Sequence, residues 1–197
     1  MYRTNRKKQG QTGFSILELV VVIVITLVVA GITVPSAVQT WQNMQLRAAS
    51  AQVADLMQHA RLQAARTNTT IPIRYQLANG MQQVYLDYNN NGVWDQQTEP
   101  LIIIPKMTAA AGAPNGGAGA PTAYVDPTSP GQPCDNTCTL AFSPRGLPCN
   151  LVGVACTTPA ASSFVYYFQN GNNGWSAVLV SKAGRTKALV WNGTSWR

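Results

Sequence analysis

The feature that most constrains this chain is a long apolar run near its start. Residues 14–34 form 21 consecutive positions with a single charged side chain, Glu18. At about 1.5 Å per residue, a helix of that length spans the roughly 30 Å hydrocarbon core of a bilayer. The run therefore predicts a transmembrane helix, and the rest of the fold must be compatible with that anchor.

Basic residues stand on only one side of this apolar run. The four that precede it are Arg3, Arg6, Lys7 and Lys8. No similar cluster follows directly, so the positive-inside rule places residues 1–13 in the cytoplasm and the chain beyond residue 34 across the membrane. A cleaved secretory signal peptide is the alternative, but its apolar region is shorter and ends at a small-residue cleavage site.

The composition gives little support for catalysis. The chain has one His, seven acidic residues and a formal net charge of +7, so it offers few pairs of side chains for general acid–base work. His59 has no Ser, Cys or acid at a motif spacing and is expected on the polar face of a helix. With 46% hydrophobic and 11% charged residues, the chain is not intrinsically disordered. These numbers predict a folded protein that is not an enzyme.

Glu18 is the exception within the apolar run. A carboxylate there costs roughly 2.5 to 3.5 kcal/mol on insertion scales, and intramembrane acids usually have a partner. The segment Gly-Phe-Ser-Ile-Leu-Glu-Leu at residues 13–19 follows a short basic leader. It closely resembles the prepilin signal of type IV pilins and type II secretion pseudopilins. The resemblance implies cleavage between Gly13 and Phe14 by prepilin peptidase, N-methylation of Phe14, and a helix-kinking proline at Pro35.

The same resemblance gives Glu18 a role in assembly. Cleavage creates a charged amine on Phe14, and in a helical filament Glu18 can neutralise the amine of a neighbouring subunit. An acid that is tolerated because it snorkels to the interface is the alternative. The implied partners are prepilin peptidase, other pilins or pseudopilins, and the inner membrane, which the chain crosses once with its N-terminus cytoplasmic and its C-terminal domain periplasmic before it joins a filament.

Beyond Pro35 the sequence first keeps a helical period and then changes to strand patterns. Residues 35–67 are predicted to continue the helix, with Pro35 bending it rather than ending it. Residues 68–197 are β-rich. We predict an α+β, type IV pilin-like fold in which a long N-terminal transmembrane and amphipathic helix packs on an antiparallel sheet. The helical positions expected to face the sheet are Val38, Trp41, Met44, Ala48, Ala51, Leu56, Ala60 and Ala64.

Seven segments of the β-rich domain are predicted as strands, at residues 71–77, 83–87, 101–104, 139–142, 163–169, 175–181 and 187–191. Residues 106–133 are rich in Gly, Ala and Pro and too poor in large apolar side chains to build a core, so they are predicted as a surface loop. Residues 60–68, 87–99 and 181–187 are similar to the GspH/FimT family of minor pilins and pseudopilins. That family likeness implies a subunit at the start or tip of a filament.

Four cysteines follow the anchor, at Cys134, Cys138, Cys149 and Cys156. An exported domain is expected to form disulfides, and three pairings are possible. Nearest-neighbour pairing is favoured because each pair closes a loop that contains Pro, Gly or Asn. A zinc site is the alternative, but the Cys-x3-Cys and Cys-x6-Cys spacings are not a common zinc pattern.

One polar segment resembles the start of a calcium-binding loop. The oxygen-bearing side chains at loop positions one, three, five and nine are Asp87, Asn89, Asn91 and Asp95, with Gly92 at position six. The closing acid is displaced, since Glu99 falls at position thirteen rather than twelve. A hairpin turn in which Asx side chains cap their own backbone is the alternative. No cofactor is required, and calcium is the one candidate.

Basic side chains gather near the C-terminus, at Lys182, Arg185, Lys187 and Arg197. The segment 184–187 is similar to the Gly-Arg-x-Arg ending of FimT-type minor pilins, which is associated with DNA binding during natural transformation. Lys187 replaces the second Arg, which keeps the charge but loses the planar fork. Without the leader the net charge falls to +3. DNA binding is therefore the second hypothesis beside filament assembly, and a solvated hairpin turn is the structural alternative.

Overall fold

The computed structural model describes residues 13–79, 81–104, 107–110, 114, 121, 131–134, 138–153, 155–157, 160, 162–170 and 174–197. The chain divides into two compact units, Met1–Thr40 and Trp41–Arg197. Residues 1–12, which hold the basic part of the predicted leader, lie outside the described residues. Most of the predicted loop at residues 106–133 lies outside them as well.

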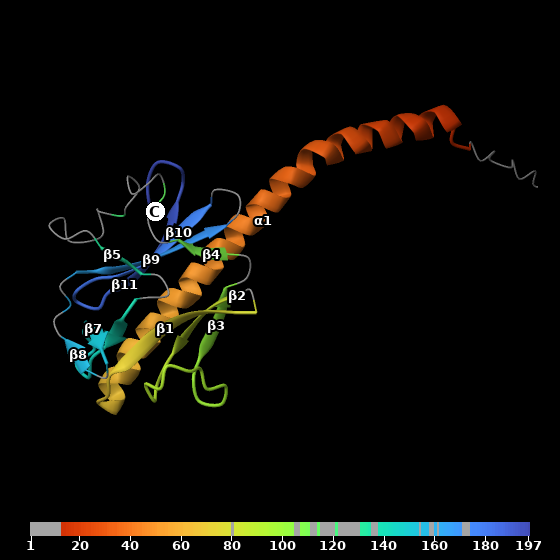
Figure 1. Cartoon of the computed structure of the whole chain (residues 1–197). Coiled ribbons are helices and arrows are strands. Elements are labelled where there is room, and N and C mark those ends of the chain that lie inside the picture. Colours follow the sequence, from red (N-terminus) through yellow and green to blue (C-terminus); the bar gives the residue numbers. More distant parts are fainter. Residues whose placement is uncertain are drawn as a thin grey trace, which may run out of the picture. The chain divides into compact units, whose positions relative to one another are not determined.

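A single helix, α1 (Ile16–Thr67), begins in the first unit and ends in the second (Figure 1). Pro35 lies inside α1, so the helix continues past it as predicted, and the bend at Pro35 stays a prediction. The helix ends where Asn68 adopts a left-handed φ of 55°. The backbone N–H of Thr69 donates to the carbonyl of Ala64 at 3.2 Å, the bond that closes a Schellman-type helix end.

The described residues after α1 form eleven strands. They are β1 (Ile71–Ala78), β2 (Met81–Leu86), β3 (Leu101–Ile104), β4 (Met107–Ala110), β5 (Gln132–Cys134), β6 (Leu140–Phe142), β7 (Pro148–Val152), β8 (Ala155–Thr157), β9 (Phe164–Asn170), β10 (Trp175–Val180) and β11 (Thr186–Trp191). All seven predicted strands are present within one or two residues. The strands β4, β5, β7 and β8 were not predicted, and β4 and β5 show that residues 106–133 are not a loop throughout.

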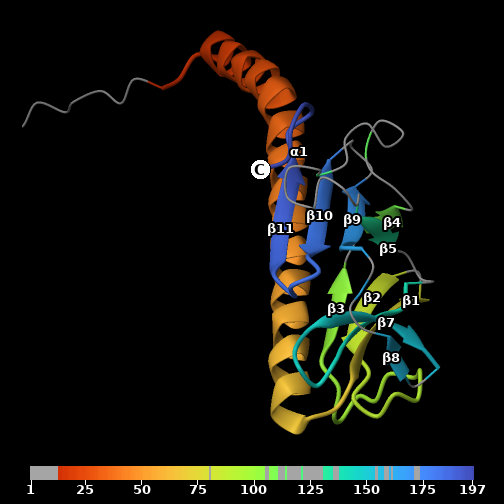
Figure 2. The same cartoon turned by 90° about the vertical axis from the view of Figure 1, so that its left-hand side faces the viewer.

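The strands form two sheets rather than the single one expected. One sheet has the order β3-β2-β1-β6-β7-β8, and the other has the order β11-β10-β9-β4, with β5 also paired to β9. Every pairing is antiparallel except that of β5 with β9, which is parallel. Figure 2 shows both sheets beside the C-terminal half of α1. The predicted α+β fold, a long N-terminal helix on antiparallel sheet, is confirmed.

The main core lies between the C-terminal half of α1 and the two sheets. The largest fully buried helical side chains are Leu46 and Met57, and the sheets contribute Ile73, Leu86 and Phe142. The predicted helical face was right at Leu56, Ala60 and Ala64 and wrong elsewhere: the exposed positions are Val38, Trp41, Met44, Ala48 and Ala51. The buried stripe instead includes Ala49, Ser50 and Val53, one helical step away from the predicted one.

The second sheet is buried on both faces. Along β9, Phe164, Tyr166 and Phe168 join the core under α1, whereas Val165 and Tyr167 join a smaller cluster on the opposite face. Trp196 covers that outer cluster and contacts the Tyr167 ring at a centroid distance of 6.1 Å. Because β9 is buried on both faces, its sequence is a nearly continuous apolar run and does not alternate between apolar and polar residues.

Candidate functional site

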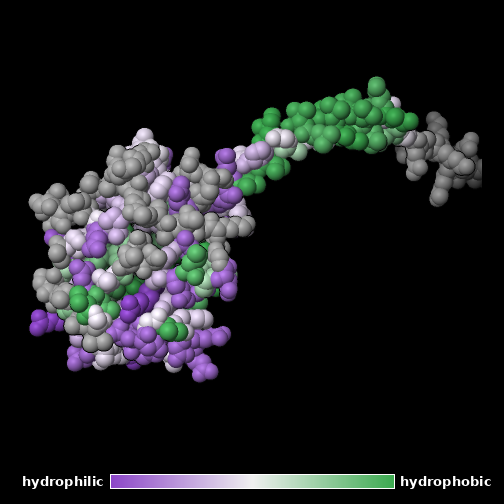
Figure 3. Space-filling model, viewed as in Figure 1, coloured by the Kyte–Doolittle hydropathy of each residue, from purple (hydrophilic) through white to green (hydrophobic). Residues whose placement is uncertain are grey.

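The N-terminal half of α1 exposes its apolar side chains. In residues 16–34 the exposed fraction of the large apolar side chains runs from 48% at Ile23 to 82% at Ile16. Figure 3 shows a continuous hydrophobic surface over this segment. Within the described residues, α1 is the one helix long and apolar enough to cross a membrane. This segment fits a membrane anchor, because insertion into a bilayer would remove its exposed apolar surface from water.

The few hydroxyl groups inside this segment are compatible with a hydrocarbon environment. Thr26 Oγ1 donates to the carbonyls of Val22 and Ile23, at 3.0 and 2.8 Å. Thr33 Oγ1 donates to the carbonyl of Val29 at 3.0 Å. Unsatisfied polar groups are costly in lipid, so bonds to the helix's own backbone remove that cost.

The predicted cleavage site lies just ahead of the helix. Gly13 and Phe14 precede the first helical residue, and Phe14 is 80% exposed. Glu18 lies in the first turn of α1, where a carboxylate interacts favourably with the positive end of the helix dipole. Among residues 13–79 and the other described residues, Glu18 has no ion-pair partner. The Gly13–Phe14 position is therefore exposed, and Glu18 lies four residues beyond Phe14 without an ion pair in the described chain.

The structure separates Arg197 from the other three C-terminal cations, since Lys182 lies in the same turn as Arg185. Arg185 lies in the turn between β10 and β11, and Lys187 lies on β11 opposite Leu179. Arg197 pairs through its backbone with Val190, with N–O distances of 2.8 and 3.0 Å. Val190 is five residues beyond Arg185, which is about 16 Å along an extended chain. Arg197 therefore does not share a site with Arg185.

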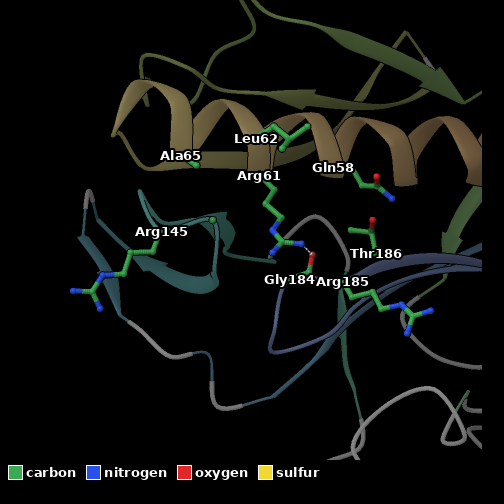
Figure 4. Close-up of a pocket in the computed structure, with 9 residues that line it drawn as sticks. Gln58, Arg61, Leu62, Ala65, Arg145, Gly184, Arg185 and Thr186 are labelled. Atoms are coloured by element: carbon green, nitrogen blue, oxygen red, sulfur yellow. Dashed lines mark hydrogen bonds between the residues drawn. The ribbon is translucent and has the colours of Figure 1, made fainter.

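Arg185 instead shares a pocket with two arginines that the sequence did not single out. A cavity of about 580 Å³ is lined by Arg61 of α1, Arg145 of the β6–β7 turn and Arg185 (Figure 4). Arg61 Nη1 donates to the carbonyl of Gly184 at 3.0 Å. The three residues lie far apart in the sequence, so no linear motif could have brought them together. Arg61 is half-buried although its side chain is charged.

Two glycines allow the two turns to meet over Arg61. Gly184 has a φ of 78°, and a Cβ placed on it would lie 2.9 Å from the carbonyl oxygen of Gly146. Gly146 has a φ of 70°, and a Cβ there would lie 3.3 Å from Arg61 Cγ. Both positions need the left-handed conformation and the missing side chain that glycine supplies. Gly184, one of the residues of the turn between β10 and β11, thus shapes the pocket wall.

The calcium-like loop is held together by its own side chains. Asp87 is fully buried and accepts hydrogen bonds from the backbone N–H groups of Asn91 and Gly92, at 3.0 and 2.9 Å, and from Arg74 Nε at 3.1 Å. Glu99 accepts from the N–H groups of Tyr88 and Asp95, at 2.8 and 2.9 Å. Both carboxylates accept hydrogen bonds from backbone N–H groups, which favours a hairpin turn over a calcium site.

The remaining candidate ligands follow the same pattern. Asn89 Oδ1 accepts from the N–H of Asn91 at 3.1 Å, and Asn91 Oδ1 accepts from the N–H of Val93 at 2.7 Å. The described residues hold no group of three or more His, Cys, Asp or Glu side chains suited to a metal ion. Burial, and secondarily the charge of Asp87, raises the pKa of Tyr85, whose Oη donates to the carbonyl of Gly92 at 3.0 Å.

The cysteines pair with their nearest neighbours, as the sequence favoured. Cys134 and Cys138 form one disulfide and Cys149 and Cys156 form the other, with Cα–Cα distances of 4.8 and 5.6 Å. Both distances lie within the usual range for a disulfide. The second bridge links β7 to β8, at the end of the first sheet.

Comparison with known proteins identifies the N-terminal motif. Residues 8–34 match the family described as the prokaryotic N-terminal methylation motif. No curated protein and no solved structure matches the chain. The motif indicates a substrate of prepilin peptidase of the type IV pilin kind, and it points to a structural rather than an enzymatic protein. The matched segment ends at Val34 and does not reach the β-rich domain.

Proposed function

We propose that this protein is a minor pilin or pseudopilin of the GspH/FimT family that takes part in building a type IV pilus or a type II secretion pseudopilus. The observation that carries the proposal is the exposed apolar half of α1, which starts within the methylation motif and contains the single acid Glu18. The family likeness of residues 60–68, 87–99 and 181–187 supports a place at the start or tip of the filament.

The motif at residues 8–34 and the long helix α1 support the following organisation. Residues 1–13 are the cytoplasmic leader, residues 14–34 cross the inner membrane, residues 35–67 carry the helix into the periplasm, and residues 68–197 form the globular domain. Cleavage after Gly13 leaves an amine on Phe14, which is then methylated. Glu18 of one subunit neutralises the amine of its neighbour, and this pairing offsets the desolvation of both charges as the helices pack.

The test separates processing from assembly. In Gly13→Val the leader should remain, which mass spectrometry of the membrane-inserted full chain detects. In Glu18→Gln, which keeps the side-chain size and removes the charge, the leader should be removed while incorporation into filaments is lost. Glu18→Asp is the matched control, because it retains the carboxylate and should retain part of the assembly. Normal filaments from Glu18→Gln would contradict the role of Glu18.

DNA binding by a displayed subunit is the second candidate function. The observation that favours it is the exposure of Arg145 and Arg185 on neighbouring turns, with Lys182 and Lys187 close to Arg185 in the sequence. The full chain in detergent micelles should then shift duplex DNA at low salt, with an affinity that falls as salt rises. The double variant Arg185→Ala with Lys187→Ala should abolish the shift, whereas Arg197→Ala should not. No shift at low salt would remove this candidate.

A further inference from the structure

We propose that the pocket formed by Arg61, Arg145 and Arg185 binds an extended acidic segment of a different protein, with an apolar side chain of that segment seated beside Leu62. The site lies entirely within the second unit, and the inference does not depend on filament assembly. It rests on the charge, the hydrogen-bonding capacity and the shape of the pocket.

The pocket carries three positive charges and no compensating acid. None of the residues that line it is acidic, and the one ion pair among the described residues, Arg74 with Asp87, lies elsewhere. Like charges around one cavity repel each other, and anionic groups placed beside them relieve that repulsion. Guanidinium groups form two parallel hydrogen bonds with a carboxylate, so an acidic side chain is a well-matched occupant.

The pocket wall holds one buried hydroxyl group that has no hydrogen-bond partner among the described residues. Thr186 is nine-tenths buried, lines the pocket, and has a hydroxyl without any hydrogen bond. Arg61 uses Nη1 for the carbonyl of Gly184, which fixes the orientation of its guanidinium group. A buried polar group without a partner is costly. A carboxylate that enters between Arg61 and Thr186 supplies the missing acceptor.

The arrangement of the arginines indicates an extended occupant. Figure 4 shows Arg145 and Arg185 on opposite sides of Arg61, with their guanidinium groups pointing away from one another. A single carboxylate or phosphate at Arg61 therefore cannot satisfy all three. A segment that lies across the pocket with several acidic residues places one charge at Arg61 and others near the two flanking arginines.

An apolar surface continues directly from this pocket. Leu62 is 69% exposed and lines both the arginine pocket and a neighbouring cavity of about 410 Å³. Leu56, Pro100 and Ile102 also line the second cavity, as does Asp55, whose charge disfavours acid at that end. The surface therefore has a cationic end and an apolar end. A segment with acids at one end and an apolar residue at the other fits both.

This pattern favours a different protein over a second copy of the chain or a nucleic acid. The chain without its leader has a net charge of +3, and two of its acids, Asp87 and Glu99, are buried in their own loop. A second copy therefore offers few free carboxylates. The outer surface of a DNA duplex presents phosphates, which match the arginines but leave Leu62 and the apolar cavity uncovered.

The test measures binding of a fluorescein-labelled peptide, Gly-Glu-Glu-Ser-Glu-Leu-Pro-Leu-Gly, to the full chain in detergent micelles by fluorescence anisotropy. The control peptide carries Gln in place of every Glu. We expect the acidic peptide to bind at low salt and the Gln peptide to bind at least about tenfold more weakly, since charge-assisted hydrogen bonds carry the affinity. No binding of the acidic peptide, or equal binding of both peptides, would overturn the proposal.

Protein variants locate the site and control for folding. The double variant Arg145→Gln with Arg185→Gln changes only exposed side chains and should weaken binding about tenfold, as should Arg61→Gln. Thr186→Val should weaken binding severalfold without lowering the melting temperature, because the buried hydroxyl has no partner to lose. Arg47→Gln, an exposed change on α1 outside the pocket, should leave binding unchanged. An equal loss in Arg47→Gln would show non-specific charge attraction and would overturn the site.

A competition with duplex DNA tests the alternative class of ligand. Duplex DNA would use the same exposed Arg145 and Arg185, so the deciding variant is Arg61→Gln, which we expect to weaken peptide binding and to leave duplex binding unchanged. If the duplex displaces the peptide and Arg61→Gln weakens duplex binding as much as peptide binding, the pocket is a phosphate site of a nucleic-acid surface, and the acidic-segment proposal fails.

Discussion

The two halves of α1 have the same secondary structure and opposite surroundings. Residues 16–40 bury no side chain within the described chain, whereas residues 41–67 bury nine residues, from Leu46 to Ala64. The second half is stabilised by the protein's own core. Residues 16–34 of the first half are apolar all round, so their surface must be covered by lipid or by other helices. Helical periodicity alone does not distinguish a helix that packs on its own domain from one that packs in lipid or against other helices. The presence of a polar face does.

The largest expected effect comes from removing the same side chain from each half. Leu46 is 1% exposed and Leu27 is 67% exposed. Leu46→Ala should lower the free energy of unfolding by about 2 to 5 kcal/mol, because it leaves a cavity. Leu27→Ala should change it by less than about 0.5 kcal/mol, because no protein contact is lost. Chemical denaturation of the full chain in detergent micelles measures both, and comparable losses would contradict the division of α1.

Reduction of the disulfides should weaken only the packed region. Both bridges lie in the β-rich domain, and their loops are short. The loop-closure argument gives roughly 2 kcal/mol for each bridge in such short loops. Reducing agent should therefore lower the melting temperature of the domain while leaving the helical signal of residues 16–40 in micelles. Mass mapping under non-reducing conditions checks the pairing, and four free thiols would contradict it.

A smaller effect is expected where the two turns meet over Arg61. Gly184→Ala places a Cβ 2.9 Å from the Gly146 carbonyl oxygen at a φ of 78°, and should lower the free energy of unfolding by about 1 to 3 kcal/mol. Gly193→Ala is the matched control, since Gly193 has a φ of 101° and open space around it. The loss of stability in Gly193→Ala should therefore reflect backbone strain alone, without a close contact. Equal losses in the two variants would mean that the close approach contributes nothing.

The parts of the fold that the sequence predicted are those with local signals. The apolar run and the motif around Glu18 are contiguous, and the hairpin strands β1–β2 and β9–β10–β11 alternate or carry turn residues at their ends. The strands β4 and β5 were missed because Ala, Gly and Pro dominate their segment and their pairing partner β9 is distant in the sequence. The helical face was shifted because small residues such as Ala51 and Ser50 carry no information on which side meets the sheets.

The candidate sites divide in the same way. The cleavage position and the disulfide spacing are local, and the sequence indicated both. The basic pocket is not local, because Arg61, Arg145 and Arg185 meet only after a helix and two turns are assembled. The spacing of polar residues in 87–99 is also local, but it is compatible with both a calcium site and a hairpin turn. The hydrogen bonds of Asp87 and Glu99 to backbone N–H groups favour the turn, which spacing alone could not decide.

The smallest expected effect is a loss of stability at alkaline pH that affects the β-rich domain and not residues 16–40 of α1. Burial raises the pKa of Tyr167 to about 12 and also raises that of its neighbour Tyr166. An unfolded tyrosine titrates near pH 10, so between pH 10 and 12 the folded state keeps a proton that the unfolded state releases. The stability contributed by this difference is complete below pH 10 and is lost as the pH rises through 12.

Melting temperatures measured from pH 9 to 12 should therefore fall for the β-rich domain, and they should fall less in Tyr167→Phe. That variant removes the phenol and keeps the ring that contacts Trp196. Since Glu18 is the only side chain in residues 16–40 with a formal charge, the helical signal of that segment in micelles should stay constant over the same range. An equal fall in the wild-type protein and in Tyr167→Phe would show that Tyr167 does not carry the effect, because the two proteins differ only in that phenol.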